Sequence, residues 1–301
     1  MRRSARLIGS FIRSRIFNQD IPLIASFKLT YRCNLACPAC LFHILSRNPG
    51  THMDWDTACR SLDTLSETGC SIVVFEGGEP LLWSDGEHTF RDLALYAHKR
   101  FASTAVTTNG TLPLDVPTDI LWVSIDGSRD THNRLRSDSY DCVMKNINSA
   151  KHSKLLVHVT LNSLNWREFP AIVRTVTAIP VVKGITVQVF YPYNQVEGSL
   201  ILMGQERKEA LETVLSMKRA GYPILNSTWG LKVMINNSWS CRERLLANVS
   251  PDGSMAQGCY VLNRSKVRCS QCGFTPVAEA SGAYGLKAGP ILAGLRIFLM
   301  H

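Results

Sequence analysis

Apolar residues follow two periods along residues 23–222, and each period predicts one kind of element. Short apolar runs rich in β-branched and aromatic residues predict strands, at 23–31, 71–80, 103–111, 119–127, 155–163 and 184–192. Apolar residues recurring every three or four positions predict helices, at 53–69, 90–101, 140–152, 166–179 and 205–221. Asp54 is the predicted N-cap of the first helix, and Gly69 its end. This succession predicts an α/β fold built on a parallel sheet.

Polar and glycine-rich clusters follow consecutive predicted strands. They fall at residues 33–40, 76–80, 107–110, 124–127 and 160–162. Because the carboxyl ends of parallel strands share one edge of a sheet, we expect these clusters to form one site.

The pattern changes near Tyr222, where helical periodicity stops, Gly, Pro, Asn and Ser become frequent, and further cysteines appear. We therefore expect an α/β core over 23–222 and a small extension over 223–275 that is held by metal more than by its own core. Residues 1–22 form a basic amphipathic arm, and residues 276–301 an apolar, basic tail.

Residues 1–19 carry five arginines and no acid, with apolar residues at helical spacing among them. Such a helix either lies on an anionic membrane surface or packs its apolar stripe on the domain with its arginines in solvent. The tail "GPILAGLRIFLMH" adds some support to the membrane alternative. Nucleic acid is disfavoured, because no aromatic stacking residues are interleaved with the arginines.

Composition narrows the class of protein. The chain has 301 residues, 45% hydrophobic and 19% charged, with a net charge of +9, which is typical of a globular protein. No apolar run is long enough to span a membrane, and arginines interrupt the N-terminal apolar residues that a signal peptide would need. We therefore expect a cytoplasmic location, with peripheral membrane contact left open. There, ten cysteines are thiols or metal ligands rather than disulfides. Cys59, Cys70 and Cys142 are expected to be buried small hydrophobes.

Cys33, Cys37 and Cys40 form a C-x3-C-x2-C motif directly after the first strand. A structural zinc site takes four protein ligands, so three thiolates leave one metal position open. This motif and its place resemble those of the radical S-adenosylmethionine (SAM) superfamily. The resemblance implies a partial (β/α)6 barrel, and a [4Fe–4S] cluster in which SAM chelates the fourth iron.

Further residues take SAM-binding roles from this resemblance. The GGEP motif, which binds the SAM amino group in that family, maps to Gly77, Gly78, Glu79 and Pro80. The segment "VSIDGSRDTHNRLRS" and two asparagines supply further implied SAM contacts, at Ser124, Asp126, Arg136, Asn109 and Asn162. The alternative is that these residues only serve strand-to-helix turns. Ala39 departs from the family, where an aromatic residue often precedes the third cysteine.

A second cysteine group is found in the C-terminal extension, at Cys241, Cys259, Cys269 and Cys272. It resembles the opening part of SPASM and twitch extensions, truncated to four cysteines. The resemblance implies an auxiliary [4Fe–4S] cluster, while four thiolates also suit zinc; a site without metal stays open.

The resemblance implies an enzyme that cleaves SAM reductively and uses the 5′-deoxyadenosyl radical on a carbon or alkene of its substrate. The basic N-terminus and the "CSQCGF" region are similar to the adenosylhopene transferase group, which favours a lipid or isoprenoid substrate. A peptide maturase is the main alternative, and other small molecules or tRNA also stay open. A non-enzymatic iron–sulfur scaffold or electron-transfer protein is a third class, which would not need the GGEP motif. An electron donor such as ferredoxin or flavodoxin is implied as a partner.

Overall fold

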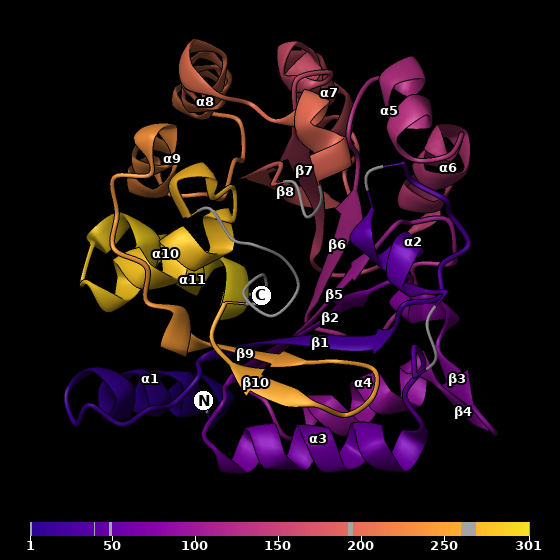
Figure 1. The fold of residues 1–301 in the computed structure, drawn as a ribbon, viewed down its shortest axis with the longest axis vertical. Helices are drawn as coiled ribbons and strands as arrows, with labels where there is room; N and C mark the ends of the chain where they lie inside the picture. The colour runs from indigo at the N-terminus through magenta and orange to yellow at the C-terminus, as the bar shows by residue number, and fades with distance from the viewer. Residues whose placement is uncertain (1, 39, 48–49, 192–194, 260–268, 301) are drawn as a thin grey trace.

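A computed structural model describes residues 2–38, 40–47, 50–191, 195–259 and 269–300. Its centre is a curved sheet of eight strands in the order β10-β9-β1-β2-β5-β6-β7-β8 (Figure 1). The six predicted strands are confirmed as β1 (Ile24–Thr30), β2 (Ile72–Gly77), β5 (Ser103–Thr108), β6 (Ile120–Ser124), β7 (Leu155–Leu161) and β8 (Val182–Val189). All six pair in parallel, so the predicted α/β fold with a partial parallel barrel is correct.

The C-terminal extension joins this same sheet. β9 (Leu246–Val249) pairs in parallel with β1, and β10 (Met255–Gln257) pairs antiparallel with β9. A separate two-stranded ribbon consists of β3 (Ser84–Asp85) and β4 (His88–Thr89). The boundary between core and extension stays a prediction.

Helices cover the outer side of the sheet. The predicted ones are confirmed as α3 (Trp55–Glu67), α4 (Phe90–His98), α6 (Tyr140–Ser149), α7 (Phe169–Thr177) and α8 (Gly204–Arg219). The pattern did not predict α2 (Leu41–Leu45), α5 (Arg129–Leu135), α9 (Thr228–Asn236), α10 (Thr275–Tyr284) or α11 (Ala288–Phe298). Short 3-10 helices lie at Pro80–Leu82, Trp166–Glu168, Gln195–Leu200, Glu243–Leu245 and Cys269–Gln271. Asp54 caps α3 as expected, accepting a hydrogen bond from Thr57 N at 2.7 Å.

The two faces of the sheet differ in chemistry. Outward side chains such as Phe27, Phe75 and Val157 are fully buried under the outer helices and form the main core. On the opposite, inner face, the amino-terminal half is apolar and is closed by the end of α11, where Phe298 packs edge-on against Trp122. The carboxyl-terminal half of the inner face is polar and leads toward the strand ends.

Helix α1 (Arg2–Arg15) is docked beneath the amino-terminal ends of the strands. Arg3 forms an ion pair with Asp119, which directly precedes β6, and also donates to Phe101 O near the start of β5. Ser10 Oγ donates to Gly69 O before β2 at 2.8 Å. In the part of the chain that the structure describes, no helix combines the length and apolar character needed to cross a bilayer.

Candidate functional site

The first cysteine group lies on the loop that follows β1. Burial raises the pKa of the Cys33 thiol to about 11, and the neighbouring Glu79 and Cys37 add to this effect. Burial also raises the pKa of Cys37, with a further contribution from Cys40, whereas Arg136 lowers it. Within the described ranges, no three His, Cys, Asp or Glu side chains converge as a closed metal-ligand set. The donor chemistry nevertheless fits an iron–sulfur cluster, since three thiols share one loop beside a guanidinium.

The GGEP turn is bonded to the cysteine loop through the backbone. Gly78 N donates to Thr30 O at 2.8 Å, and Glu79 N donates to Arg32 O at 2.9 Å. Gly77 has a φ of +127°, and a Cβ on Gly78 would lie 2.2 Å from Arg32 O. Glycine is therefore required at both positions, for conformation at the first and for close approach at the second.

Glu79 is fully buried and organises the turn from within. It accepts hydrogen bonds from Thr108 Oγ1 at 2.7 Å, Asn109 N at 2.7 Å and Leu81 N at 3.1 Å. Burial raises the pKa of Glu79 to about 6, although these three hydrogen bonds oppose that shift. Pro80 follows as the first residue of a short 3-10 helix that Glu79 caps. The Glu79 carboxylate therefore holds the ends of β2 and β5 together.

Asn109 connects the end of β5 to the cysteine loop. Its Nδ2 donates to Asn34 Oδ1 at 2.9 Å and toward Cys33 Sγ at 3.6 Å. Its Oδ1 accepts from Thr111 N at 2.9 Å. The structure thus places Asn109 against the loop, and Asn34, which the sequence did not single out, is its partner. The only signal for Asn34 is its position directly after the first cysteine of the motif.

Asp126 and Arg136 form a second fixed element beside the loop. Arg136 Nε donates to Asp126 Oδ2 at 2.6 Å, and Thr160 N donates to Asp126 Oδ1 at 2.7 Å. Burial lowers the pKa of Arg136, but Asp126 and the thiols of Cys37 and Cys40 outweigh burial and raise it. The guanidinium therefore stays charged next to two of the three thiols.

Two further predicted contacts lie on the same side of the sheet. Ser124 is buried at the end of β6, opposite His158 of β7. Asn162 closes the turn after β7, where its Oδ1 accepts from Leu164 N at 2.9 Å and its Nδ2 donates to Thr160 O at 3.3 Å. Both Asn162 contacts match the turn role weighed from the sequence. Ala39 lies outside the described residues.

A buried charge pair lies on the inner face next to this site, and the sequence pattern did not reveal it. Lys28 of β1 is fully buried, 3.5 Å from Glu76 of β2 and 3.2 Å from Asn248 Oδ1 of β9. Ser26 Oγ contacts both the Lys28 ammonium and the Glu76 carboxylate. The available signal was a lysine within an otherwise apolar strand, since a buried lysine needs a partner.

His158 adds a neutral imidazole to the inner face. Burial lowers the pKa of His158 to about 4, with Asp126 and Arg136 acting in opposite directions. Its Nδ1 lies 2.9 Å from Thr186 Oγ1 of β8. Together with Lys28 and Glu76, this residue makes the middle of the inner face a hydrogen-bonding surface rather than a hydrocarbon one.

The second cysteine group is brought together from separate segments. Cys241 precedes β9, Cys259 follows β10, and Cys269 and Cys272 precede α10. Burial raises the pKa of Cys241 to about 12, and Cys259, Cys272 and then Cys269 contribute to this shift. The four thiols therefore share one electrostatic environment, and their chemistry fits either iron–sulfur or zinc, although they too are not closed into a ligand set.

Arg207 of α8 fixes one side of this second group. It is buried and donates to Cys272 O at 2.6 Å, Met234 O at 2.8 Å and Asn237 Oδ1 at 3.1 Å. The guanidinium therefore ties the last cysteine pair to α8 and α9.

The remaining cysteines lie apart from both groups. Cys70 is buried as expected, Cys59 is half-buried, and Cys142 is exposed, so the expectation of burial is wrong for Cys142.

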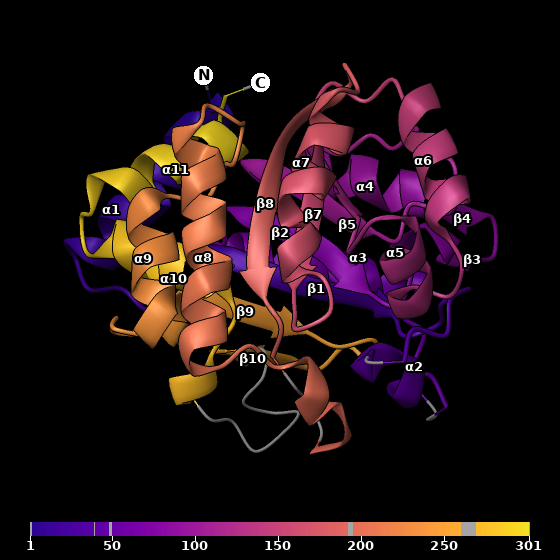
Figure 2. The same cartoon turned by 90° about the horizontal axis from the view of Figure 1, so that it is seen from above.

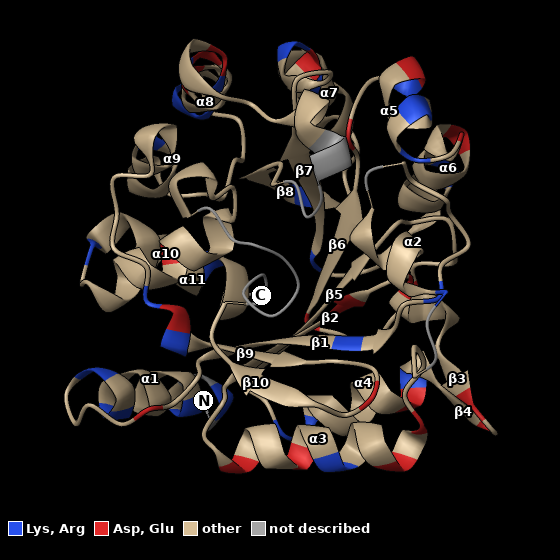
Figure 3. Ribbon diagram, in the orientation of Figure 1, with Lys and Arg blue, Asp and Glu red and all other residues tan. Residues whose placement is uncertain are grey.

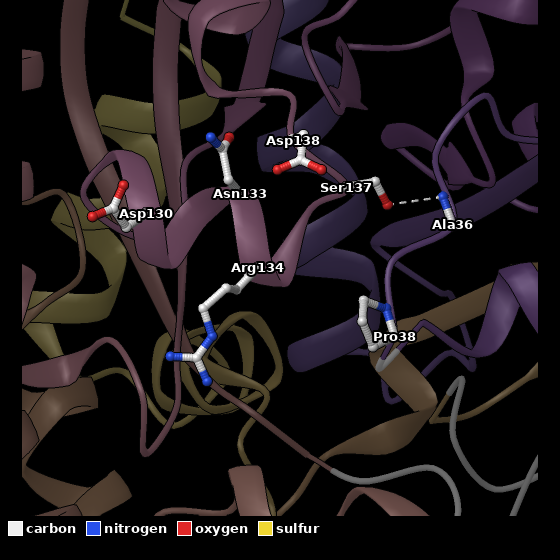
Figure 4. Close-up of a pocket in the computed structure, with 7 residues that line it drawn as sticks. All are labelled: Ala36, Pro38, Asp130, Asn133, Arg134, Ser137 and Asp138. Carbon is white, nitrogen blue, oxygen red and sulfur yellow. Dashed lines mark hydrogen bonds between the residues drawn. The ribbon is translucent and has the colours of Figure 1, made fainter.

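A pocket of about 500 Å³ lies beside the first cysteine loop (Figure 4). Ala36 and Pro38 of the loop form one side, and the other side is formed by Asp130, Asn133, Arg134, Ser137 and Asp138. Ala36 N donates to Ser137 Oγ at 3.1 Å, which joins the two sides. The pocket gives the outer surface of the loop a polar, charged surrounding.

Comparison with known sequences identifies a family. The model described as "Radical SAM superfamily" matches residues 27–176. The Fe-coproporphyrin III synthase of Methanosarcina barkeri is 26% identical over 168 residues, which cover 52% of this chain and 41% of that protein. The mycofactocin maturase MftC of Mycobacterium tuberculosis is 34% identical over 106 residues, covering 35% of this chain and 25% of that protein. The aligned parts thus span less than half of these curated relatives.

Solved structures show the same fold. Streptococcus suis SuiB bound to S-adenosylmethionine has a TM-score of 0.65 at 14% identity, covering 91% of this chain and 70% of that chain. SuiB bound to its precursor peptide SuiA has a TM-score of 0.63 at 14% identity, covering 93% and 70%. The segment that the radical SAM family model matches, residues 27–176, begins within β1 and ends within α7. It contains the cysteine loop and the GGEP turn. With this family match and this fold, the chain belongs to the radical SAM superfamily.

Proposed function

We propose that Cys33, Cys37 and Cys40 hold a [4Fe–4S] cluster and that the chain is an enzyme that cleaves SAM reductively. When bound, this cluster and SAM supply one-electron cleavage of the sulfonium, which yields methionine and a 5′-deoxyadenosyl radical. The observation that carries the proposal is the cysteine loop itself, which is bonded to the GGEP turn and lies beside Arg136. The radical would then modify an unactivated carbon or an alkene.

The surrounding residues would hold the loop and its negative charge. Arg136 offsets the repulsion among gathered thiolates, and Asp126 orients the guanidinium. Asn109 donates toward Cys33, which favours the thiolate. Gly77 and Gly78 leave backbone groups close to the loop for the SAM amino group. Contacts of Pro80, Ser124 and Asn162 with SAM are part of the proposal.

Anaerobic reconstitution tests this proposal. We would count iron and sulfide and measure 5′-deoxyadenosine for the wild type and for a Cys33→Ala/Cys37→Ala/Cys40→Ala variant. The matched control is Cys59→Ala/Cys142→Ala, which removes thiols outside both groups. SAM cleavage by the wild type and control alone supports the proposal and excludes a mere electron-transfer scaffold. Cleavage by the triple variant, or by none of the three proteins, contradicts it.

We also propose an auxiliary [4Fe–4S] cluster on Cys241, Cys259, Cys269 and Cys272. The shared environment of these thiols supports a common ligand, and zinc is the alternative. The same reconstitution separates the two: about eight irons in the wild type and four in the triple variant indicate two clusters. Four irons in the wild type, accompanied by zinc, would assign the second site to zinc.

The substrate is proposed to carry hydrogen-bonding groups. Glu76, whose side chain is 28% exposed beside buried Lys28, and neutral His158 support a polar substrate, since a carboxylate facing hydrocarbon is costly. This observation favours a peptide, as in SuiB with its precursor peptide, over the hydrocarbon part of a lipid or isoprenoid. A lipid with a polar head remains the second candidate, which the basic, apolar α1 supports. Deuterium-labelled peptides and lipids would separate these two candidates. The enzyme should remove deuterium only from the class of molecule that is its substrate.

The proposal includes a cytoplasmic location, where cysteine thiols stay reduced. It also includes a reducing partner such as ferredoxin or flavodoxin. The exposed surface of the cysteine loop beside the charged pocket supports access for such a donor.

A further inference from the structure

Helix α1 turns an apolar row away from the protein. Ile8 and Ile12 of α1 are 51% and 40% exposed, and Ile16 and Phe17, which directly follow the helix and continue the row, are 70% and 68% exposed. A Cβ placed on Gly9 would meet no atom within 4 Å. This row therefore lacks any covering element among the described residues.

The cause is that α1 docks through a mostly polar side. Arg3 makes hydrogen bonds of 2.9 and 2.5 Å to Asp119, and Ser10 Oγ donates to Gly69 O. Ser14 is buried, and its carbonyl accepts from Tyr284 Oη at 3.0 Å. Amphipathic helices of globular proteins usually bury their apolar stripe. Here three isoleucines stay outside because serines and an ion pair occupy the contact.

Apolar residues at the border of the helix complete the docking. Leu7 and Phe11 are half-buried, and Phe11 packs edge-on against Tyr284 of α10 at 6.3 Å. The sequence left two arrangements open, a helix on a membrane surface and a helix packed on the domain. Only the second describes Leu7 and Phe11, and the exposed isoleucines are left for the first. The apolar stripe of α1 therefore has a half-buried part that packs on the protein and an exposed part, which the isoleucines form.

Arginines flank the free row on both sides. At about 100° per residue, Arg15 lies beside Ile8 on one side of the row, and Arg6 and Arg13 lie on the other. All three arginines are exposed, although Arg6 donates to Ser66 Oγ at 2.8 Å and Arg15 Nε donates to Tyr284 O at 2.9 Å, so each of these two guanidinium groups keeps only its remaining N–H donors for a ligand. Among the described residues, Asp119, bound by Arg3, is the only acid paired with α1. In Figure 3 the blue residues of α1 are all arginines, since the helix contains no lysine and no acidic residue.

We propose that α1 binds an anionic lipid surface, with the three isoleucines among the acyl chains and the flanking arginines at the phosphates. An apolar stripe with basic borders suits this interface, because it gains both apolar burial and attraction to anionic headgroups. A second copy is a poorer occupant, since a two-fold contact would bring like-charged arginines together. This proposal does not depend on SAM cleavage.

The position of α1 sets the orientation of the bound protein. It lies at the amino-terminal end of β1, and the cysteine loop and α2 lie at the other end (Figures 1 and 2). The seven residues of β1 span about 23 Å. The candidate site therefore stays away from the bilayer, so the contact holds the protein in place rather than delivering an acyl chain directly to the site.

Co-sedimentation of the full chain with vesicles tests the proposal. The probes are vesicles of phosphatidylcholine alone and of phosphatidylcholine mixed with phosphatidylglycerol. The test variant is Ile8→Ser/Ile12→Ser, and the matched control is Leu95→Ser/Met255→Ser, whose side chains are similarly exposed at 44% each but lie elsewhere. Because all four side chains are exposed, both variants should fold and cleave SAM as the wild type does.

We expect binding to the anionic vesicles only, weakened by salt, and reduced at least about tenfold in the Ile8→Ser/Ile12→Ser variant. The control variant should bind as the wild type does. Equal binding by both variants, or no binding by the wild type, would overturn the proposal. So would a dimer in sedimentation velocity that the isoleucine variant dissociates, because a second copy would then cover the row. SAM cleavage measured alongside keeps this outcome separate from that of the proposed enzyme function.

Discussion

Replacing Glu79 by glutamine should remove a defined part of the pH dependence of folding. The Glu79 carboxyl is fully buried at the GGEP turn, where it accepts three hydrogen bonds. Burial raises its pKa from 4.5 to about 6 against the effect of those bonds. The folded state therefore holds this proton more tightly than the unfolded state does.

The sign and size follow from linkage. Because the folded pKa lies above the unfolded one, the stabilisation from proton binding is fully present below about pH 4.5 and is lost as pH rises through about 6. A difference of about 1.5 in pKa corresponds to about 2 kcal/mol in the free energy of unfolding. Glu79→Gln cannot release this proton and so lacks this dependence.

Urea unfolding of the iron-free protein between about pH 4.5 and 7.5 would measure the effect. The stability of the wild type relative to Glu79→Gln should fall by about 2 kcal/mol over this range, whatever the offset between them. The exposed Glu67→Gln variant controls for net charge and should run parallel to the wild type. Parallel curves for the wild type and Glu79→Gln would refute the reasoning, since Glu79 would then titrate as an ordinary carboxyl.

Four further substitutions test the packing around the two cysteine groups and α1. Gly78→Ala should cost about 1–3 kcal/mol of stability and lower iron retention, because its Cβ would clash with the cysteine loop. The control Gly9→Ala adds a Cβ in open space on a helix and should stabilise the protein by about 0.5–1 kcal/mol. Equal effects of the two substitutions in chemical unfolding would contradict the predicted clash. Asp119→Asn should destabilise by about 2 kcal/mol near neutral pH by losing its charged bond to Arg3. Arg3 and Thr104 hold the pKa of Asp119 below its usual value of 3.8 despite burial. The difference in unfolding free energy between Asp119→Asn and the wild type should therefore shrink as pH falls below about 4. A difference that does not change with pH would argue against the ion pair. Arg207→Met should lower metal content at the second group while leaving SAM cleavage at the first measurable, and unchanged metal content would exclude its positioning role.

Much of the fold could be predicted because it depends on local patterns. A buried strand needs an apolar run, and a helix on one face needs an apolar residue every third or fourth position, so β1, β2 and β5 through β8 were predictable. Among the elements that escaped prediction, α5 and β9 are short and owe their form to neighbours. β9 forms a strand because the edge of β1 offers it hydrogen-bonding partners.

The candidate site divides in the same way. The three thiols of the first loop and the glycines of the GGEP turn are set by sequence spacing, because the members of each motif lie within a few residues of one another. The partners of Glu79 and Asn109 were not predictable, because Thr108 and Asn34 lie far from them in the chain. The bond of Asn162 to Leu164 is local and matches the turn role weighed from the sequence.

The sequence alone determined the alternation of strands and helices, the thiol motif and the basic, amphipathic character of α1. Only the tertiary structure decided that Lys28 meets Glu76 across two strands, and that the isoleucines of α1 face outward while its serines face the protein. The physical reason is that sequence periodicity defines which faces an element has. The partner against which each face packs depends on contacts between residues far apart in the chain.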